Sequence, residues 1–302
     1  MSDIAFLAEE TAETRAPRGG RVLRRLAANP EFWIGAVLVA FFLLITVWPA
    51  SVAGLFGHGD PRECDLSFSR RPPDPAAGHP FGFTVQGCDL YASVVHGAAN
   101  SITVGIVVTL GTALIAIVLG MLAGYLGGWV DTLLSRISEV VVSVPLLLGA
   151  VLVLNSIEAR NVWFVSAVLI AFSWPAAMRV MRTSTISIRA RSFVTAAKAL
   201  GLPTWRILLS HVIPNTVGPV IVLGTLQVGA VIASEAALTY LGIGLQAPAL
   251  SWGLQLSQAE AYFADAPHLL YFPAGALTLA VGGFVLLGEA VRQAGFHSSN
   301  GA

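Results

Sequence analysis

Long, mostly apolar stretches are the feature that most constrains this chain. An α-helix needs about 20 such residues to cross about 30 Å of hydrocarbon. The segments that qualify are 32–55, 98–124, 132–155, 161–182, 216–241 and 268–291. Composition agrees, because only 11% of the residues are charged, whereas soluble domains carry about 25%. The sequence therefore predicts an all-α, polytopic membrane protein with six transmembrane helices.

The basic residues are distributed unevenly between the two sides that six spans define. If the N-terminus is inside, 13 of the 17 Lys and Arg residues fall inside. Cytoplasmic loops are enriched in these residues. We therefore expect a cytoplasmic tail at 1–31, a cytoplasmic segment at 183–215 and a cytoplasmic tail at 295–302. Acidic residues in the first tail, with no apolar run before Phe32, argue against a cleavable signal peptide.

The segment 56–97 is then extracytoplasmic, and it holds both cysteines of the chain, Cys64 and Cys88. Because exported compartments are oxidising, we expect a disulfide between them. Two unrelated free thiols are the alternative. His58 and His79 lie nearby, but their spacing matches no zinc pattern, so no metal site is predicted.

The positions of glycine and proline in the cytoplasmic segment predict two short helices joined by a turn. A helix is expected at 193–200, with Gly201 in the left-handed conformation that ends it. Pro203 suits the start of the next helix, which we expect Pro214 to interrupt. Small alanines in the first helix leave little side-chain bulk. Such a compact knob can seat in a groove of another protein.

This segment resembles the coupling loop of ABC import permeases, whose pattern is Glu-Ala-Ala, three residues, Gly, and later His-Ile-Leu-Pro-Asn. The positions in register are Ala196, Ala197, Gly201, His211, Pro214 and Asn215. Thr195 stands where the family often has glutamate. A bare Ala-Ala-x-x-x-Gly would be weak, whereas its combination with the second motif, between membrane helices, is specific.

The resemblance covers nearly the whole chain and is to the dipeptide/oligopeptide subfamily, in particular its second permease subunit (the DppC/OppC type). The matching segments are Arg24–Pro30, His79–Gly82 with Gly87 and Asp89, Gly124–Asp131 with Arg136, Leu241–Gln246 with Ser251–Gly253, Phe272–Gly275, and Leu287–Glu289 with Arg292. Cys88 replaces the arginine that is usual before the aspartate, which makes a lineage-specific disulfide with Cys64 more attractive.

The resemblance implies an ABC type I importer permease fold, with a first helix at 32–55 and a core at 98–294 in a bacterial cytoplasmic membrane. Two permease subunits would pair around a central path, in contact with membrane lipid. The residues implied in ATPase coupling are Thr195, Ala196, Ala197, Gly201 and Pro214. An extracytoplasmic binding protein would deliver peptides, with 246–267 forming part of its docking face.

ATP must be bound and hydrolysed by another protein, because this chain has no phosphate-binding Gly-x-x-x-x-Gly-Lys-Ser/Thr sequence. We therefore expect partner ATP-binding subunits, no enzyme activity in this chain and no cofactor. The neutral net charge argues against nucleic acid as a partner.

Ionisable groups inside spans are costly and often functional. Glu235 has two interpretations, a place in the translocation path or an interhelical hydrogen bond. Glu139 can pair with Arg136, and Glu289 with Arg292, at i,i+3 spacing. Gly120 and Gly124 suit close helix packing, which we expect to be within the chain.

Other functions remain open at this point. The same architecture could carry nickel or haem. An ion-coupled secondary transporter would need inverted repeats and interrupted helices at the midplane, and none is evident. A membrane protease would need a nucleophile with a base, or paired aspartates, inside the spans. A structural scaffold would not need the coupling-loop motif.

Overall fold

The computed structural model describes residues 24, 26–56, 60–157 and 160–296. Most of both predicted tails therefore lies outside the described residues, as does His58. Among the described residues, five helices are long and apolar enough to cross a membrane, and a bent pair makes a sixth candidate. The helices are α3 Pro30–Val47, α4 Pro49–Phe56, α5 Leu90–Leu126, α6 Gly128–Ser143, α7 Leu146–Asn155, α8 Val162–Arg189, α9 Ser192–Ala199, α10 Thr204–Ile207, α11 Ile213–Tyr240, α12 Trp252–Ala259 and α13 His268–Phe296.

The first expected span is two helices. Asn29 caps α3 by accepting a hydrogen bond from the Glu31 N–H at 2.9 Å, and Pro30 fits the first helical position, where its missing N–H costs nothing. The helix ends before Trp48, because the residue before a proline is pushed out of the α region. Pro49 then begins α4.

The second span, α5, begins earlier than the sequence suggested, at Leu90 rather than at 98. The Asp89 carboxylate caps it by accepting from the Ala92 N–H at 2.9 Å. Further along, α8 packs against α5 at two glycines. A Cβ at Gly120 would lie 2.6 Å from the Met178 carbonyl oxygen, and one at Gly124 would lie 2.7 Å from that of Arg182. These glycines therefore serve packing within the chain, as predicted.

The third expected span, 132–155, is a bent pair of helices. The chain bends by 81° between α6 and α7. Val144 is extended there, with φ −89° and ψ 118°, because Pro145 follows it. The two halves of this candidate span therefore run in different directions.

The fifth span is longer than expected, because helical structure runs without a break from Thr204 to Tyr240. The expectation that Pro214 interrupts this helix was wrong. A π-helical segment, Leu208–Val212, precedes α11, and single π turns commonly relieve strain inside a helix. Pro214 follows this π-helical segment directly, in the first turn of α11, and the changed hydrogen-bond pattern there accommodates its missing N–H.

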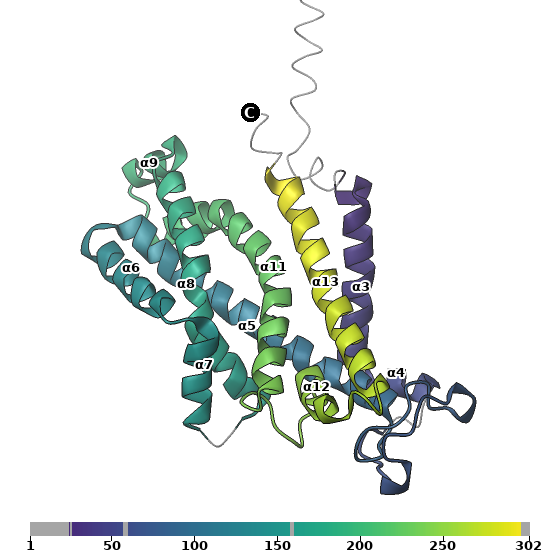
Figure 1. The fold of residues 1–302 in the computed structure, drawn as a ribbon. Coiled ribbons are helices and arrows are strands. Elements are labelled where there is room, and N and C mark those ends of the chain that lie inside the picture. The colour runs from purple at the N-terminus through teal and green to yellow at the C-terminus, as the bar shows by residue number, and fades with distance from the viewer. Residues whose placement is uncertain (1–23, 25, 57–59, 158–159, 297–302) are drawn as a thin grey trace, which may run out of the picture.

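Figure 1 shows how the ends of the bundle differ. The coupling-loop helix α9, the start of α3 and the end of α13 lie at one end, and α4 and α12 lie at the other, beside the segment 60–89. The two outer helices α3 and α13 pack closely, since a Cβ at Gly35 would lie 2.6 Å from the Leu287 nitrogen. This separation of the coupling loop from the cysteine-bearing segment agrees with the arrangement expected from sequence.

Candidate functional site: a coupling loop and an intramembrane groove

The coupling loop is closed by a hydrogen-bonded turn after α9. Gly201 has φ +75°, and its N–H donates to the Lys198 carbonyl at 3.0 Å. The Leu202 N–H donates to the Ala197 carbonyl at 3.2 Å. This pair of bonds is the Schellman motif, which needs a left-handed residue and favours glycine. The helix end predicted at Gly201 is therefore confirmed.

One face of this loop packs on its own chain. Val194 is fully buried and Ala197 is 5% exposed. They lie in an apolar cluster with Met121 and Tyr125 of α5. The Lys198 ammonium lies 4.8 Å from the centre of the Tyr125 ring, a cation–π distance. Ala197 therefore supports α9 from behind.

The opposite surface of the loop is exposed. We call it the coupling face, and its residues are Thr195, Ala196, Leu200, Gly201 and Trp205. Leu200 is 81% exposed and Trp205 is 63% exposed. The sequence motif led to the small residues and missed these two apolar side chains. Their exposure depends on which way α9 faces, and the motif does not specify that direction.

Pro214 is exposed on the following helix, away from the turn that Gly201 forms.

An ion pair joins helix α6 to helix α8. The Arg182 guanidinium donates from Nε to Asp131 Oδ1 at 2.5 Å and from Nη2 to Oδ2 at 2.6 Å. Two parallel bonds of this kind fix orientation as well as distance. Sequence reasoning missed this pair, because 51 positions separate its members.

The two local ion pairs expected from sequence are confirmed. Arg136 Nη1 donates to Glu139 Oε2 at 2.7 Å, and Arg292 Nε donates to Glu289 Oε2 at 2.7 Å. The Arg136–Glu139 pair is well exposed on α6. Exposed pairs of this kind contribute only about 0–1 kcal/mol.

Glu235 lies where α11 meets α12 and α5. Its side chain is fully buried. One carboxylate oxygen accepts from the Thr239 hydroxyl at 2.8 Å, and that hydroxyl accepts from the Leu245 N–H at 3.0 Å. Ser101 and Ser251 lie beside the carboxyl group. The bond to Thr239 lies within α11, and the fully buried carboxyl group sits at the junction with α5 and the start of α12, which favours a structural role.

A groove opens on the bundle between α6 and α7, α8, and α11. Its volume is about 420 Å³. The walls are mostly apolar, with Phe172 from α8 and Leu223 from α11. Polar groups are few, and Ser173 and Gln227 are two of them. Largely apolar concavities with a few polar groups are typical of ligand sites.

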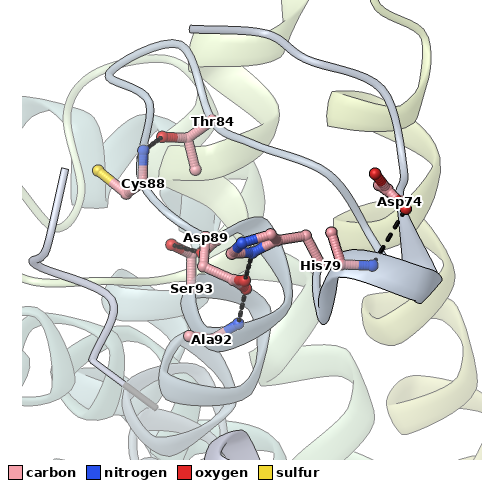
Figure 2. Close-up of polar contacts among 8 residues, drawn as sticks. Asp74, His79, Thr84, Cys88, Asp89, Ala92 and Ser93 are labelled. Atoms are coloured by element: carbon pink, nitrogen blue, oxygen red, sulfur yellow. Dashed lines mark hydrogen bonds and ion pairs between the residues drawn. The ribbon is translucent and has the colours of Figure 1, made fainter. Parts of the chain in front are cut away.

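At the opposite end of the bundle, the segment 60–89 is tied to α5. Cys64 and Cys88 form a disulfide with an S–S distance of 2.04 Å, as the sequence predicted. Figure 2 shows the neighbouring contacts: the Cys88 N–H donates to the Thr84 hydroxyl at 3.0 Å, and the Asp89 carboxylate contacts His79 Nδ1 at 2.6 Å. Asp89 thereby joins this segment to the start of α5.

Asp65 begins a short turn beside the disulfide. The Ser67 backbone N–H donates to its carboxylate at 2.8 Å. This bond holds the pKa of the Asp65 carboxyl below its ordinary value. In the described ranges, no three His, Cys, Asp or Glu side chains lie together as a candidate metal site.

Comparison with known proteins agrees with this geometry. Residues 116–293 match the family described as binding-protein-dependent transport system inner membrane component. The dipeptide transport system permease protein DppC of Alkalihalophilus pseudofirmus is 32% identical over 274 residues, covering 90% of this chain and 87% of that protein.

Two further relatives are similar over a comparable length. The glutathione transport system permease protein GsiD of Escherichia coli is 37% identical over 270 residues, which is 87% of this chain and 88% of that protein. The oligopeptide transport system permease protein OppC of Bacillus subtilis is 29% identical over 270 residues, which is 89% of this chain and 86% of that protein.

A bundle of five or six apolar helices of membrane-spanning length, among the described residues, is the architecture of a polytopic membrane permease. The chain belongs to the family of binding-protein-dependent transport system inner membrane components, as the match over 116–293 shows. The resemblance to ABC transporter permeases found in the sequence is thus confirmed.

Proposed function

We propose that this chain is the pore-forming permease subunit of an ATP-driven importer that carries peptides across a bacterial cytoplasmic membrane. The observation that carries the proposal is the coupling face, an exposed apolar and small-residue surface at one end of a bundle of this family. Both chain termini and α9 face the cytoplasm in this proposal, and the disulfide segment faces outward.

The proposed mechanism needs three kinds of partner. ATP-binding subunits dock on the coupling face, a second permease subunit completes the path, and an extracytoplasmic binding protein delivers the peptide. When the ATP-binding subunits close, α9 moves with them. The bundle then switches between outward-facing and inward-facing states, which is alternating access. All ATP hydrolysis takes place in the partner subunits.

The coupling residues have different roles in this proposal. Thr195, Ala196 and Gly201 contact the ATP-binding subunit, together with Leu200 and Trp205. Large apolar and aromatic side chains commonly anchor protein interfaces. Ala197 transmits the force inward, because it packs on the cluster around Met121 and Tyr125. Pro214 lies on the long helix that continues from the loop.

The groove between α6–α7, α8 and α11 is this chain's share of the translocation path in the proposal. Its few polar groups suit a cargo whose side chains vary, because apolar walls select weakly among them. Glu235 is hydrogen-bonded to Thr239 of its own helix, lies beside the start of α12 and does not itself line the groove. Peptide cargo is supported by the names of the relatives, which are given for dipeptide, oligopeptide and glutathione transport. None of these three names mentions nickel or haem.

The test is uptake of labelled dipeptide and labelled glutathione into proteoliposomes that contain this chain, its partner subunits and the binding protein. We expect uptake with ATP, and none when the ATP-binding subunits lack their phosphate-binding lysine. Collapse of the ion gradients should leave uptake unchanged. Uptake that needs an ion gradient and ignores ATP would contradict the proposal and favour a secondary transporter.

A further inference from the structure

Helix α6 has few packing contacts with the rest of the bundle. Within α6, every residue of which is described, only Ser138 is buried. Leu134 and Val141 are partly buried against a small cluster between α5 and α8. The bidentate ion pair of Asp131 with Arg182 is therefore the strongest directional contact that joins α6 to the rest of the bundle.

The Arg182 side of this pair belongs to a stiff part of the chain. Around it, α8 meets α5 backbone to backbone, since a Cβ at Gly124 would lie 2.7 Å from the Arg182 carbonyl oxygen. Close-packed contacts of this kind shift as units. Helix α8 continues to Arg189, and α9 begins at Ser192. A displacement of α9 therefore reaches Arg182 through a short run of continuous helix.

The far end of α6 has the opposite character. It stops at Ser143, and the extended Val144 and Pro145 turn the chain by 81° into α7. Residues from both sides of this break line the groove, with Val142 from α6 and Leu146 from α7. A few terminal residues that absorb backbone rotation are the usual form of a hinge.

We propose that Asp131 and Arg182 link α6 to the coupling loop, so that α6 moves with α8 and α9 and pivots against α7 at Val144–Pro145. The pivot changes the wall of the groove at Val142. Asp131 and Arg182 are positioning residues, because neither lines the groove. This inference rests on the proposed function, since it gives the route by which the coupling loop would act on the path.

The bidentate geometry suits this task better than an apolar contact would. Two N–H···O bonds resist both separation and rotation of the two helices. A lysine in place of Arg182 would keep the charge and lose the fork of donors. The neighbouring Arg136–Glu139 pair offers a matched control, because it also carries one positive and one negative charge on α6 but is well exposed.

The experiment measures spin-label distances in the assembled transporter, with ATP and vanadate as the probe. New cysteines are placed at exposed sites, Ile137 on α6, Ile186 on α8 and Leu152 on α7. Within this chain labelling is selective, because its two native cysteines form the disulfide, and the partner subunits are used in cysteine-free form. Distances are compared between the nucleotide-free and the vanadate-trapped complex.

In the unsubstituted background, we expect the Ile137–Ile186 distance to stay constant on trapping and the Ile137–Leu152 distance to change. With Asp131→Asn the second change should be lost. Peptide uptake per ATP hydrolysed should fall about tenfold, within the usual range of coupling between sites. Basal ATP hydrolysis should persist, which a merely structural defect would not allow. The double exchange of Asp131→Arg with Arg182→Asp should restore uptake. Glu139→Gln should leave both the distance change and the uptake per ATP hydrolysed as they are.

A constant Ile137–Leu152 distance in the protein that keeps Asp131 and Arg182 would overturn the inference, and this result needs only the spin-labelled cysteines at exposed sites. The inference also fails if Asp131→Asn shows the full distance change. In both cases the complex would still assemble and hydrolyse ATP, so the proposed function would survive. Absence of any complex with ATP-binding subunits would instead defeat the proposed function.

Discussion

Replacement of Gly201 by valine tests the coupling loop with little disturbance elsewhere. The φ of +75° at Gly201 lies in the left-handed region, which costs an ordinary residue about 1–2 kcal/mol. Branching at Cβ makes valine less tolerant still. A Cβ at this position would meet no atom within 4 Å. The penalty is therefore one of backbone conformation, without a clash in the core.

A penalty of about 1–2 kcal/mol shifts the balance between the native turn and its alternatives by about 5- to 30-fold. We expect Gly201→Val to assemble into the complex in normal amounts and to lose most ATP-driven uptake. Gly201→Asn is the matched control, because asparagine tolerates the left-handed conformation, and it should keep most uptake. The assay is uptake into proteoliposomes, normalised to the amount of assembled complex. Normal uptake by Gly201→Val would show that the left-handed turn is not needed for coupling.

Three further predictions follow from individual contacts. Replacing Cys64 and Cys88 with serine should lower stability by about 3 kcal/mol, measured by thermal unfolding of the purified complex, and uptake at low temperature should persist; unchanged unfolding would show that the bridge adds nothing. Glu235→Gln should retain uptake, whereas Glu235→Leu, which removes the acceptor for Thr239, should lower the yield of folded protein; loss of uptake in a well-folded Glu235→Gln protein would indicate a role in the path. Glu139→Gln should change stability by less than about 1 kcal/mol, and a larger drop in unfolding temperature would mean that this pair is buried in the complex.

Features set by neighbours in sequence were predictable. The turn at Gly201 follows from a few residues whose backbone preferences agree, and the structure has it. The pairs Arg136–Glu139 and Arg292–Glu289 follow from helical spacing alone, and both are present. In each case the determining interaction spans less than two helical turns.

The effect of each proline on its helix could not be predicted from the neighbouring sequence. Pro175 and Pro273 lie inside helices that continue past them, whereas Pro145 marks a bend of 81°. In membrane helices, neighbouring helices decide whether the freed backbone groups are satisfied. The sequence identifies the prolines and carries no direct sign of which one breaks its span.

Contacts between distant segments were also out of reach. Asp131 ends the matching segment Gly124–Asp131 and Arg182 is one of the basic residues counted on the inner side, but nothing local in the sequence pairs them. The sequence also does not indicate which face of α9 is buried. Ala197 points inward and Leu200 outward, and this division depends on how the loop rests on Tyr125 and Met121.

Contact between α9 and an ATP-binding subunit can be detected by site-specific cross-linking. A cysteine at Ala196, in the assembled transporter, is treated with a short bifunctional thiol reagent against cysteines along the groove of the ATP-binding subunit. We expect a cross-link from the exposed Ala196, and none from the matched buried position Ala197. If a transporter imports peptide with ATP but yields no cross-link from Ala196, α9 does not dock on the ATP-binding subunit.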